Sequence, residues 1–296
     1  MMRVVLGLCA IAIIGAAGFL LVTRPVKTDP AELVNLTGDA TRGEMVFWAG
    51  GCASCHAAPE AKGADKLVLA GGLRLTTPFG TFAVPNISPD PTHGIGGWTA
   101  ADLDSAMRHG TSPEGQHYYP AFPYTSYAHA THQEVADLWA FLQTLPPSDR
   151  ANDPNELSFP FNQRLLLGGW KFLNPPSGWV VNAPLTPEEE RGRALVEGLG
   201  HCGECHTPRG PLGGRELTRW LAGGPNPEGK GTIPNITPAH LTWSQDEIVE
   251  YMTSGFTPDY DSAGGEMASV VENIAHLPDA DRAAIAAYLA KVPPVE

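Results

Sequence analysis

The chain contains the pattern Cys-x-x-Cys-His twice, as Cys52-Ala53-Ser54-Cys55-His56 and as Cys202-Gly203-Glu204-Cys205-His206. This pattern is typical of a covalently attached c-type haem, because the two cysteines can form thioethers and the next histidine can bind the iron. A structural zinc ion needs a tetrahedral ligand set, whereas these pairs lie 150 positions apart (202 − 52). The motifs therefore predict two haems c. The attaching residues are Cys52, Cys55, Cys202 and Cys205, and the proximal iron ligands are His56 and His206.

The sequence around these motifs is duplicated. Pro85-Asn86-Ile87-Ser88-Pro89 returns as Pro234-Asn235-Ile236-Thr237-Pro238, at an offset of 149 (234 − 85). An Arg-Gly pair precedes each motif, and a Pro-Pro pair closes each half. Landmarks that recur in one order at a nearly constant offset indicate tandem domains. We expect a first domain over residues 35–147, an interdomain segment over 148–185 and a second domain over 186–296.

Helix signals dominate both halves. Capping boxes are predicted at Thr99 with Asp102, Thr186 with Glu189, and Ser244 with Glu247. The last helix of each half is expected over residues 132–144 and 279–291, ahead of the Pro-Pro pairs, and few alternating runs indicate strands. The expected fold class is all-α, with two tandem, class I-like cytochrome c domains preceded by a single N-terminal transmembrane helix.

The interdomain segment differs in composition from a plain linker. Its ends are polar and rich in proline, but residues 159–170 read FPFNQRLLLGGW. This run is too apolar for a mobile tether, which is normally polar or rich in glycine and serine. We therefore expect a short helix here that packs across the domain junction.

The N-terminus predicts a membrane segment. The 19 residues from 4 to 22 are apolar and are followed by Thr23-Arg24-Pro25, close to the about 20 residues that span a bilayer. A cleaved signal has a shorter apolar core before its small residues. We expect residues 1–24 to be a retained anchor, with a cleaved signal as the alternative. Because c-type haem is attached outside the cytoplasmic membrane, the expected location is the bacterial inner membrane, with the haem domains in the periplasm.

The charge of the chain restricts its partners. There are 32 acidic and 19 basic residues, which give a net charge of −13. Nucleic acid rewards a basic surface, so we expect no nucleic-acid partner. An acidic exterior favours a protein with a basic docking patch, although solubility alone would also account for the charge.

The sixth iron ligand is expected in the loop between the middle and last helices of each half. In the second half this loop, about 255–278, contains one methionine, Met267, directly after Gly264-Gly265-Glu266. A thioether opposite histidine raises the reduction potential and closes the site. Met267 is therefore the predicted sixth ligand of the second haem. His276 is the weaker candidate, because it lies near the start of the last helix.

The first half lacks this methionine. Met267 lies nine residues after Pro258, and the residue nine after the matching Pro113 is Phe122, which cannot bind iron. His117 is the leading candidate for the sixth ligand, Met107 is the alternative, and an empty or water-filled position is the third reading. His129 aligns with His276 and is expected to be a solvated or capping residue. With His117 bound, the first haem would have two histidine ligands and the lower potential, so electrons would pass from the first haem to the second.

Three segments of the first half carry a family resemblance: residues 77–81 (TPFGT), 94–99 (GIGGWT) and 119–127 (YPAFPYTSY). With them, the chain resembles the multihaem cytochrome c subunits of bacterial membrane-bound alcohol, sugar-acid and molybdenum-type hydroxylating dehydrogenases. The resemblance covers nearly all of residues 35–296. It implies an electron-transfer subunit and not a catalyst. Such a subunit takes electrons from a membrane-bound or periplasmic dehydrogenase subunit and passes them to a quinone, a soluble cytochrome c or a terminal oxidase.

The same resemblance implies that the two Pro-Asn-Ile segments line the haems, where a backbone carbonyl would hold the Nδ1–H of His56 or His206. Two features depart from the family: many relatives have methionine where this chain has Phe122, and some have three haem domains. The alternative function is a dihaem peroxidase-like enzyme with an open first haem. That enzyme needs a vacant iron and a distal acid–base residue, for which His117 or His109 would serve.

Overall fold

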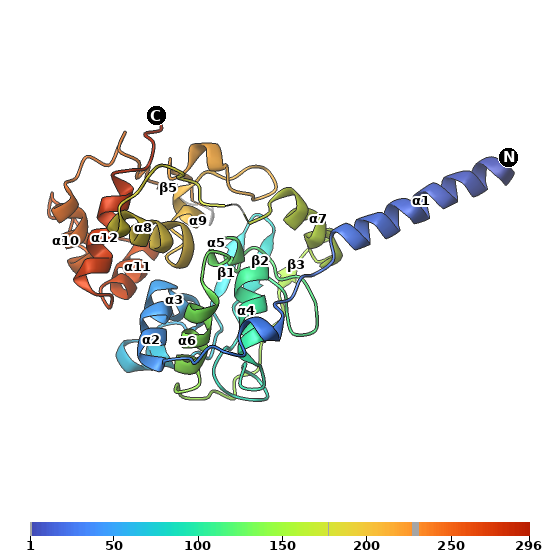
Figure 1. Cartoon of the computed structure of the whole chain (residues 1–296), viewed down its shortest axis with the longest axis horizontal. Coiled ribbons are helices and arrows are strands. Elements are labelled where there is room, and N and C mark those ends of the chain that lie inside the picture. The colour runs from blue at the N-terminus through green and yellow to red at the C-terminus, as the bar shows by residue number, and fades with distance from the viewer. Residues whose placement is uncertain (1, 177, 227–230) are drawn as a thin grey trace.

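The computed structural model describes residues 2–176, 178–226 and 231–296. Helix α1 (Met2–Val22) extends as an isolated rod from a globular body, and none of its residues is buried. By length and composition it is the one helix among the described residues that could cross a membrane. In the body, the first half of the sequence lies beside the second half, and α7 (Leu165–Leu173) lies at the foot of α1 (Figure 1).

The first half consists of short helices and a small sheet. Its helices are α2 (Ala40–Ala49), α3 (Cys52–His56), α4 (Ala100–His109), α5 (Tyr124–Tyr127) and α6 (His132–Leu142), with 3-10 turns η1 (Pro30–Glu32) and η2 (Gly63–Leu67). Strands β1 (Arg74–Thr77) and β2 (Gly80–Ala83) form an antiparallel hairpin in which Thr77 pairs with Gly80. The interdomain segment supplies the third strand, β3 (Glu156–Leu157), through pairing of Thr81 with Glu156.

The second half repeats this helical order. Its elements are α8 (Pro187–Arg193), a π-helical turn η3 (Ala194–Leu199), α9 (Gly203–His206), the 3-10 turn η4 (Leu217–Arg219), β4 (Gly224–Pro225), β5 (Thr232–Ile233), α10 (Gln245–Ser254), α11 (Glu266–Ile274) and α12 (Asp279–Leu289). Helices dominate both halves, as predicted, and the strands are few and short. The three predicted capping boxes all form, at the starts of α4, α8 and α10.

The Arg-Gly pairs explain how the first and last helices of each half meet. A Cβ atom on Gly43 would lie 1.9 Å from the Asp137 carbonyl oxygen, so α2 crosses α6 at a distance that only glycine allows. Gly192 takes the same place between α8 and α12, 1.9 Å from Ala284 O by the same measure. The arginine before each glycine then binds a carboxylate of the partner helix, Asp137 in the first half and Asp281 in the second.

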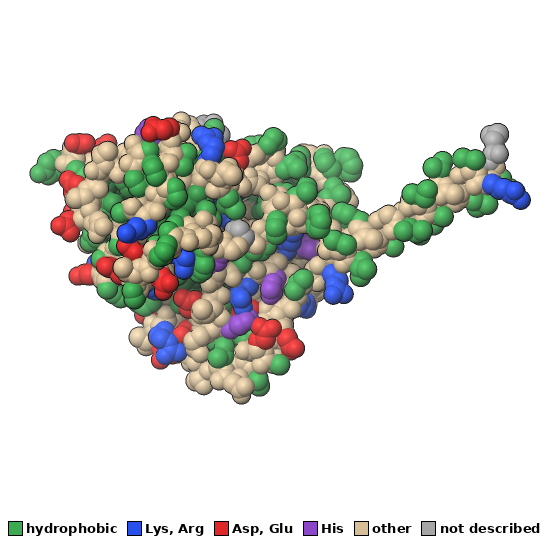
Figure 2. Space-filling model, turned by 45° about the horizontal axis from the view of Figure 1, so that its top comes forward, with side chains coloured by type: hydrophobic (Ala, Val, Ile, Leu, Met, Phe, Trp, Pro, Cys, Tyr) green, Lys and Arg blue, Asp and Glu red, His purple; other side chains and the backbone are tan. Residues whose placement is uncertain are grey.

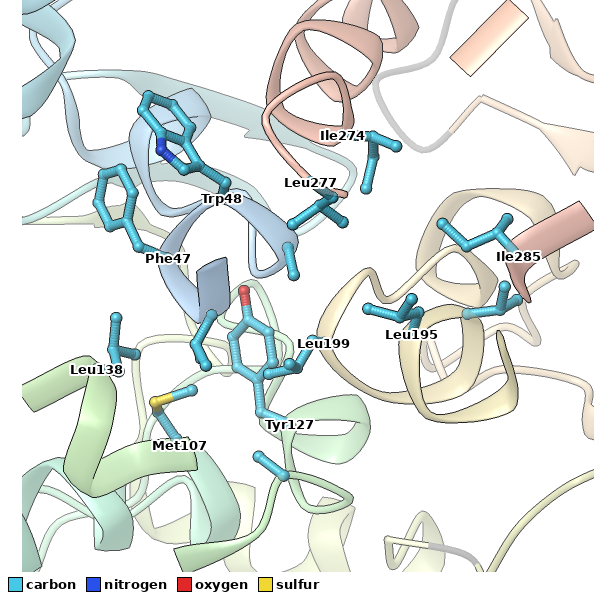
Figure 3. Packing of buried hydrophobic residues seen from close by; sticks show 14 of the residues in the cluster. Phe47, Trp48, Met107, Tyr127, Leu138, Leu195, Leu199, Ile274, Leu277 and Ile285 are labelled. Carbon is cyan, nitrogen blue, oxygen red and sulfur yellow. The ribbon is translucent and has the colours of Figure 1, made fainter. Parts of the chain in front are cut away.

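The two halves share one hydrophobic core. A single cluster of buried side chains contains Phe47, Met107 and Leu138 from the first half and Leu195, Leu199 and Ile285 from the second (Figure 3). Tyr127, Leu199 and Leu277 lie where the halves meet. Because burying apolar surface drives folding at roughly 25 cal/mol per Å², the halves are held together by the same force that stabilises each one.

The helix predicted in the interdomain segment is present as α7, and it contacts both halves. Trp170 Nε1 donates a hydrogen bond to Leu212 O of the second half at 2.8 Å. Lys171 Nζ donates to the carbonyl oxygens of His109 and Gly110 in the first half, at 2.7 and 2.6 Å. The interdomain segment therefore contacts both halves at their junction, as expected from its apolar sequence.

Candidate haem sites

Each Cys-x-x-Cys-His motif folds into a single short helix, α3 in the first half and α9 in the second. The turn of helix brings both cysteines of a motif to one side, as attachment to one haem requires. Gly51, before α3, has φ +62° and so allows the chain to turn sharply from α2 into the motif. The Tyr127 hydroxyl fixes this turn by donating to Gly50 O at 2.6 Å.

The proximal histidines are held by the same clamp in both halves. His56 Nδ1 lies 2.8 Å from Pro85 O, and His206 Nδ1 lies 2.9 Å from Pro234 O. A carbonyl accepts only from N–H, so Nδ1 carries the proton and Nε2 keeps its lone pair for a metal. The predicted contact between the Pro-Asn-Ile segments and the two histidines is confirmed.

A glycine completes each clamp from the backbone side. Gly71 N–H donates to His56 O at 2.7 Å, and Gly223 N–H donates to His206 O at 2.7 Å. A Cβ atom on Gly71 would lie 2.5 Å from the Pro85 carbonyl carbon, and one on Gly223 would lie 2.7 Å from the matching carbon of Pro234. These glycines therefore let the Pro-Asn-Ile strap lie directly against the histidine.

The asparagine of each strap fixes its position. Asn86 Nδ2 donates to Ser148 O at 2.8 Å, just after the last helix of the first half. Asn235 Nδ2 donates in the same way to Val295 O at 2.7 Å, at the end of the second half. Each asparagine also accepts from the backbone N–H two residues later. The repeated motif is thus a strap that ties the histidine clamp to the C-terminal helix of its half.

The chemistry of these residues fits a covalent haem. Burial lowers the pKa of both His56 and His206, which keeps the imidazoles neutral, as an iron ligand must be. Burial also raises the pKa of Cys52 and Cys202 to about 12. Thiols in such apolar surroundings are poor thiolate ligands for zinc, but they suit thioether bonds at the apolar edge of a porphyrin. The residues that would hold each haem are therefore those predicted from the motifs.

The candidate sixth ligand of the second haem, Met267, lies in the first turn of α11. Gly265, the residue before this helix, has φ +55°, so the chain turns sharply just ahead of Met267. The competing candidate, His276, is engaged elsewhere. Its ring stacks on Trp48 of the first half, with centroids 3.8 Å apart and planes 6° from parallel.

The distal hairpins of the two halves have the same bridge register. An isolated bridge joins Thr111 to His117 in the first half and Phe256 to Ser262 in the second, an offset of 145 in each case (256 − 111 and 262 − 117). The same offset matches Met267 with Phe122. The Phe122 ring packs against Tyr118 and Tyr127, with centroids 5.9 and 5.6 Å apart. The sequence alignment that placed phenylalanine opposite methionine is therefore supported by the hairpin geometry.

The candidates for the first haem lie on different sides of the first half. His117 is buried near the foot of α1, where its Nε2 lies 2.9 Å from Thr23 O. Its Nδ1 is buried and has no hydrogen-bond partner among the described residues. Met107 is buried in the shared core, and its counterpart Met252 also packs against that core. His129 stacks on Trp179 with centroids 4.1 Å apart, so it is a packing residue at the junction and not a solvated one.

The two motifs face each other's halves across the interface. Ser54, between the cysteines of α3, accepts a hydrogen bond from Asn273 Nδ2 in α11 at 2.6 Å. Glu204, at the same position of α9, accepts from the hydroxyls of Thr125 and Ser126 in α5 at 3.1 and 3.0 Å. Helix α5 follows Phe122, and helix α11 contains Met267. The contacts are thus reciprocal, and each attachment helix lies against the distal helix of the other half.

Glu204 is a buried carboxylate at this interface, and it is paired with two arginines. Burial alone would raise the pKa of Glu204, but Arg215 and Arg209 outweigh it and lower the pKa to about 2. Arg209 Nη2 lies 2.6 Å from Glu204 Oε2, and Arg215 Nη1 lies 3.5 Å from Oε1. Arg215 also donates to Ser126 Oγ at 3.0 Å. The buried carboxylate within the second motif therefore stays charged, and two arginines at the interface balance its charge.

Sequence reasoning missed several residues of these sites. The clamp glycines could have been found from the sequence, because Leu-Ala-Gly-Gly occurs at 69–72 and again at 221–224. The interface pair Ser54 and Asn273 carried no such signal, because the two residues are 219 positions apart in the sequence. Such contacts depend on how the two halves pack.

Comparison with known proteins supports this assignment. The sequence model of the cytochrome c family matches residues 40–146 and 189–293. A diheme cytochrome c-type protein of Cereibacter sphaeroides is 71% identical over 290 residues, which is 98% of each chain. The fructose dehydrogenase cytochrome subunit of Gluconobacter japonicus is 36% identical over 277 residues, 91% of this chain and 56% of the relative.

A further relative is a nicotinate dehydrogenase subunit of Pseudomonas putida, 39% identical over 263 residues, which are 85% of this chain and 21% of that protein. The chain thus spans about half or less of these two dehydrogenase components, but nearly all of the diheme cytochrome. The relatives are named as cytochromes or as subunits of dehydrogenases. The chain belongs to the cytochrome c family and carries two c-type haems, as an electron-transfer protein and not as the catalytic subunit of a dehydrogenase.

Proposed function

We propose that the chain takes electrons from a partner dehydrogenase and passes them to a quinone, a soluble cytochrome c or a terminal oxidase outside the cytoplasmic membrane. The observation that carries this proposal is the reciprocal interface, in which each haem-attachment helix lies against the other half. Because the interface is part of one shared core, electron exchange between the two sites needs no movement of one half relative to the other.

When bound, each haem supplies a one-electron iron couple, and the protein sets its ligands and surroundings. The Pro85 and Pro234 carbonyls orient the two proximal imidazoles. Burial lowers the pKa of those imidazoles, which keeps them neutral. Ligands that are already held in place move little when the charge on the iron changes, which favours rapid electron exchange.

We propose Met267 as the sixth ligand of the second haem, because it is the matched distal residue and follows the sharp turn at Gly265. For the first haem we propose His117, whose buried Nδ1 has no hydrogen-bond partner in the part of the chain that the structure describes, with Met107 as the alternative. The two sites would then have different potentials, since imidazole lowers the potential relative to a thioether. Electrons would run from the first site to the second.

We place the chain in the bacterial inner membrane, with α1 as a single-pass anchor and both haem domains in the periplasm. Helix α1 has 21 residues, and at about 1.5 Å per residue it is close to the about 30 Å of the hydrocarbon layer. Its side chains are exposed along the whole length, as expected for a helix that faces lipid. A cleaved signal is the alternative, and the mass of the mature protein distinguishes the two.

The electron donor is proposed by relationship. Relatives named as subunits of fructose, gluconate, alcohol and nicotinate dehydrogenases suggest a dehydrogenase of a small hydroxylated or heteroaromatic compound. The acidic net charge of −13 would attract a partner with a basic docking surface, so complex formation should weaken as salt is raised.

The test uses membranes that contain the full-length chain. Sugars, sugar acids, alcohols and heteroaromatic acids are supplied in turn while the α-band of reduced haem c is followed. The matched control is the double variant Cys202→Ala/Cys205→Ala, which lacks one of the two attachment sites. We expect one substrate class to reduce both haems of the wild-type chain, and only half as much haem in the variant. If reduction by every substrate were the same with and without the chain, the proposal would be wrong.

Carbon monoxide separates the carrier from the peroxidase-like alternative. The alternative is considered because Phe122, which cannot bind iron, lies at the position matched to Met267. A carrier with two closed sites leaves the spectrum of the reduced protein unchanged under carbon monoxide. Stoichiometric binding at one haem, together with peroxide turnover, would favour the enzyme.

A further inference from the structure

Helix α7 has its hydrophobic and polar faces reversed relative to a helix of a soluble domain. Its apolar side chains point outward: Leu165, Leu166, Phe172 and Leu173 are 50–66% exposed. The spacing i, i+1, i+7 and i+8 places all four on one side of the helix. Lys171 lies on another side, and its ammonium group turns inward to two carbonyl oxygens. A soluble amphipathic helix does the opposite, burying its apolar face and exposing its charges.

This outward face is continuous with α1. The α7 helix packs on the last turns of α1 through two glycines. A Cβ atom on Gly168 would lie 2.7 Å from Thr23 Cβ, and one on Gly169 would lie 3.2 Å from the Phe19 ring. Gly169 lies on the same side of α7 as the four exposed apolar residues. Figure 2 shows hydrophobic side chains gathered around the foot of α1, next to the globular body.

The loop before α7 extends the apolar surface. Phe159 is 79% exposed and Phe161 is 41% exposed, and phenylalanine is a common apolar residue of segments that lie in the membrane interface. Basic residues lie at the same end of α1: Arg24 and Lys27 follow the helix directly and are exposed. Basic side chains at this level meet the phosphates of lipid headgroups.

From these observations we propose that α7 and the Phe159–Phe161 loop lie in the headgroup–acyl boundary of the bilayer that α1 enters, with the face of Leu165, Leu166, Phe172 and Leu173 in contact with lipid. The depth agrees with this placement. Phe19 is three residues before the end of α1, so Gly169 beside it lies about 5 Å inside the hydrocarbon edge at about 1.5 Å per residue. Interfacial helices bury their apolar face by about 5–10 Å.

The consequence is a fixed orientation of the haem domains. Arg164, at the start of α7, donates to His117 O at 2.9 Å and so ties the helix to the distal hairpin of the first half. Trp170 ties the same helix to the second half. A single transmembrane helix would let the body swivel, whereas α7 in the interface holds both halves at one angle to the membrane. This inference rests on the proposed retention of α1 as an anchor.

The test measures depth in the full-length haem protein, reconstituted in vesicles of phosphatidylcholine with phosphatidylglycerol. In a Cys9→Ser background, Leu166→Cys and Leu173→Cys carry a small fluorophore, and Val34→Cys and Tyr260→Cys are controls at sites 73% and 92% exposed. Each site is quenched by nitroxide-labelled lipid and, separately, by aqueous iodide. We expect the lipid quencher to be favoured roughly threefold at 166 and 173, and iodide to be favoured at 34 and 260.

Vesicle flotation and the intact mass are measured on the same samples. If the protein floats with its N-terminus intact but 166 and 173 are quenched like the controls, the interfacial helix is wrong and the anchor stands. If the protein lacks residues 1–22 and does not float, both the anchor and the interfacial helix are wrong. Shallow quenching at 166 and 173 in floating protein would overturn the depth argued from Phe19.

Discussion

The two halves of the chain agree on the proximal side of the haem and differ on the distal side. In both, a proline carbonyl holds the histidine, a glycine N–H holds its backbone carbonyl, and an asparagine ties the strap to the last helix. On the distal side, Met267 opens the nine-residue α11, whereas the matched Phe122 precedes the four-residue α5. All four residues of α5 are buried, but most of α11 is at least partly exposed.

This difference shows which parts of the duplicated unit were free to change. Haem attachment and the tautomer of the iron ligand depend on the clamp, so both copies retain it. The distal residue sets the potential and the openness of the iron. With the proposed ligands, divergence on the distal side would let one polypeptide hold two haems of unequal potential on the same scaffold.

The largest effect is expected from removing one attachment site. Cys52→Ala/Cys55→Ala and Cys202→Ala/Cys205→Ala should each lose half of the covalent haem, measured by the pyridine haemochrome spectrum and the intact mass. Cys9→Ser, in the N-terminal helix, should lose none. Equal haem content in all three variants would show that the cysteines of the two motifs do not attach the haem.

Exchanging the distal residues tests the difference itself. Met267→Phe should lower the potential of the second haem by on the order of 100 mV, within the about 0.8 V range that axial ligands span. Phe122→Met should raise the potential of the first haem, because the thioether would approach from the matched position. Both are followed by spectroelectrochemical titration.

Controls for the exchange identify the present ligand of the first haem. Met252→Leu, at the position matched to Met107, should leave both potentials unchanged, since Met252 packs against the core. His117→Ala should change the electron paramagnetic resonance signal of the first haem if the imidazole binds iron. If Met107→Leu changes that signal and His117→Ala does not, Met107 is the ligand.

The reciprocal interface gives the third prediction, because its two contacts have different chemistry. Glu204→Gln leaves two arginines without a buried carboxylate and should lower the free energy of unfolding by about 3 kcal/mol. Ser54→Ala removes one neutral hydrogen bond and should cost about 1 kcal/mol. Both are measured by guanidinium denaturation.

The control for this pair is Glu216→Gln, a partly exposed carboxylate 3.8 Å from the guanidinium of Arg219. It should have an effect below that of Ser54→Ala, since surface ion pairs are worth little. An effect of Ser54→Ala as large as that of Glu204→Gln would mean that the charge cluster does not dominate the interface.

The smallest effect concerns pH. Burial, followed by Arg215 and Arg193, lowers the pKa of His129 from 6.5 to about 4. The unfolded chain therefore takes up this proton first, so the stability gained from a neutral His129 is present above pH 6.5 and is lost as the pH falls towards 4. Melting temperatures should fall less steeply for His129→Gln than for wild type between about pH 7 and about pH 4.5.

His240→Gln is the matched control, because that histidine is exposed and lies in the second half. Its melting temperature should follow the wild-type curve across the same range. A His129→Gln curve parallel to wild type would show that burial and the two arginines do not keep the imidazole of His129 neutral.

Haem attachment was predictable from the motifs and the histidine clamp from the family resemblance, whereas the interface between the halves was not predictable. Thioether attachment and the histidine clamp involve residues within about thirty positions of each other, and both recur in the second copy. The capping boxes are local as well, and they formed where Thr99, Thr186 and Ser244 predicted them. Repetition doubled the signal for each of these features.

The unpredicted features depend on contacts without a repeat. The hairpin of β1 and β2 gains its third strand from the interdomain segment. No alternation of apolar and polar residues in that segment had predicted a strand. The stack of His276 on Trp48 crosses the two halves, so alignment within one half could not show it. The apolar run at 159–170 predicted a helix that packs across the domain junction. The exposure of the apolar face of α7 was not predictable, because it depends on where α1 leaves the globular body.

The single hydrophobic cluster has a consequence for the ancestry of the chain. When two copies of a gene are joined, either copy can at first be lost without harm to the other. Here the side of each copy that faces the other is apolar and is buried by the other copy. An exposed apolar patch of this kind promotes aggregation. Either copy produced alone would expose that side, so the pair should persist as a unit once it has formed.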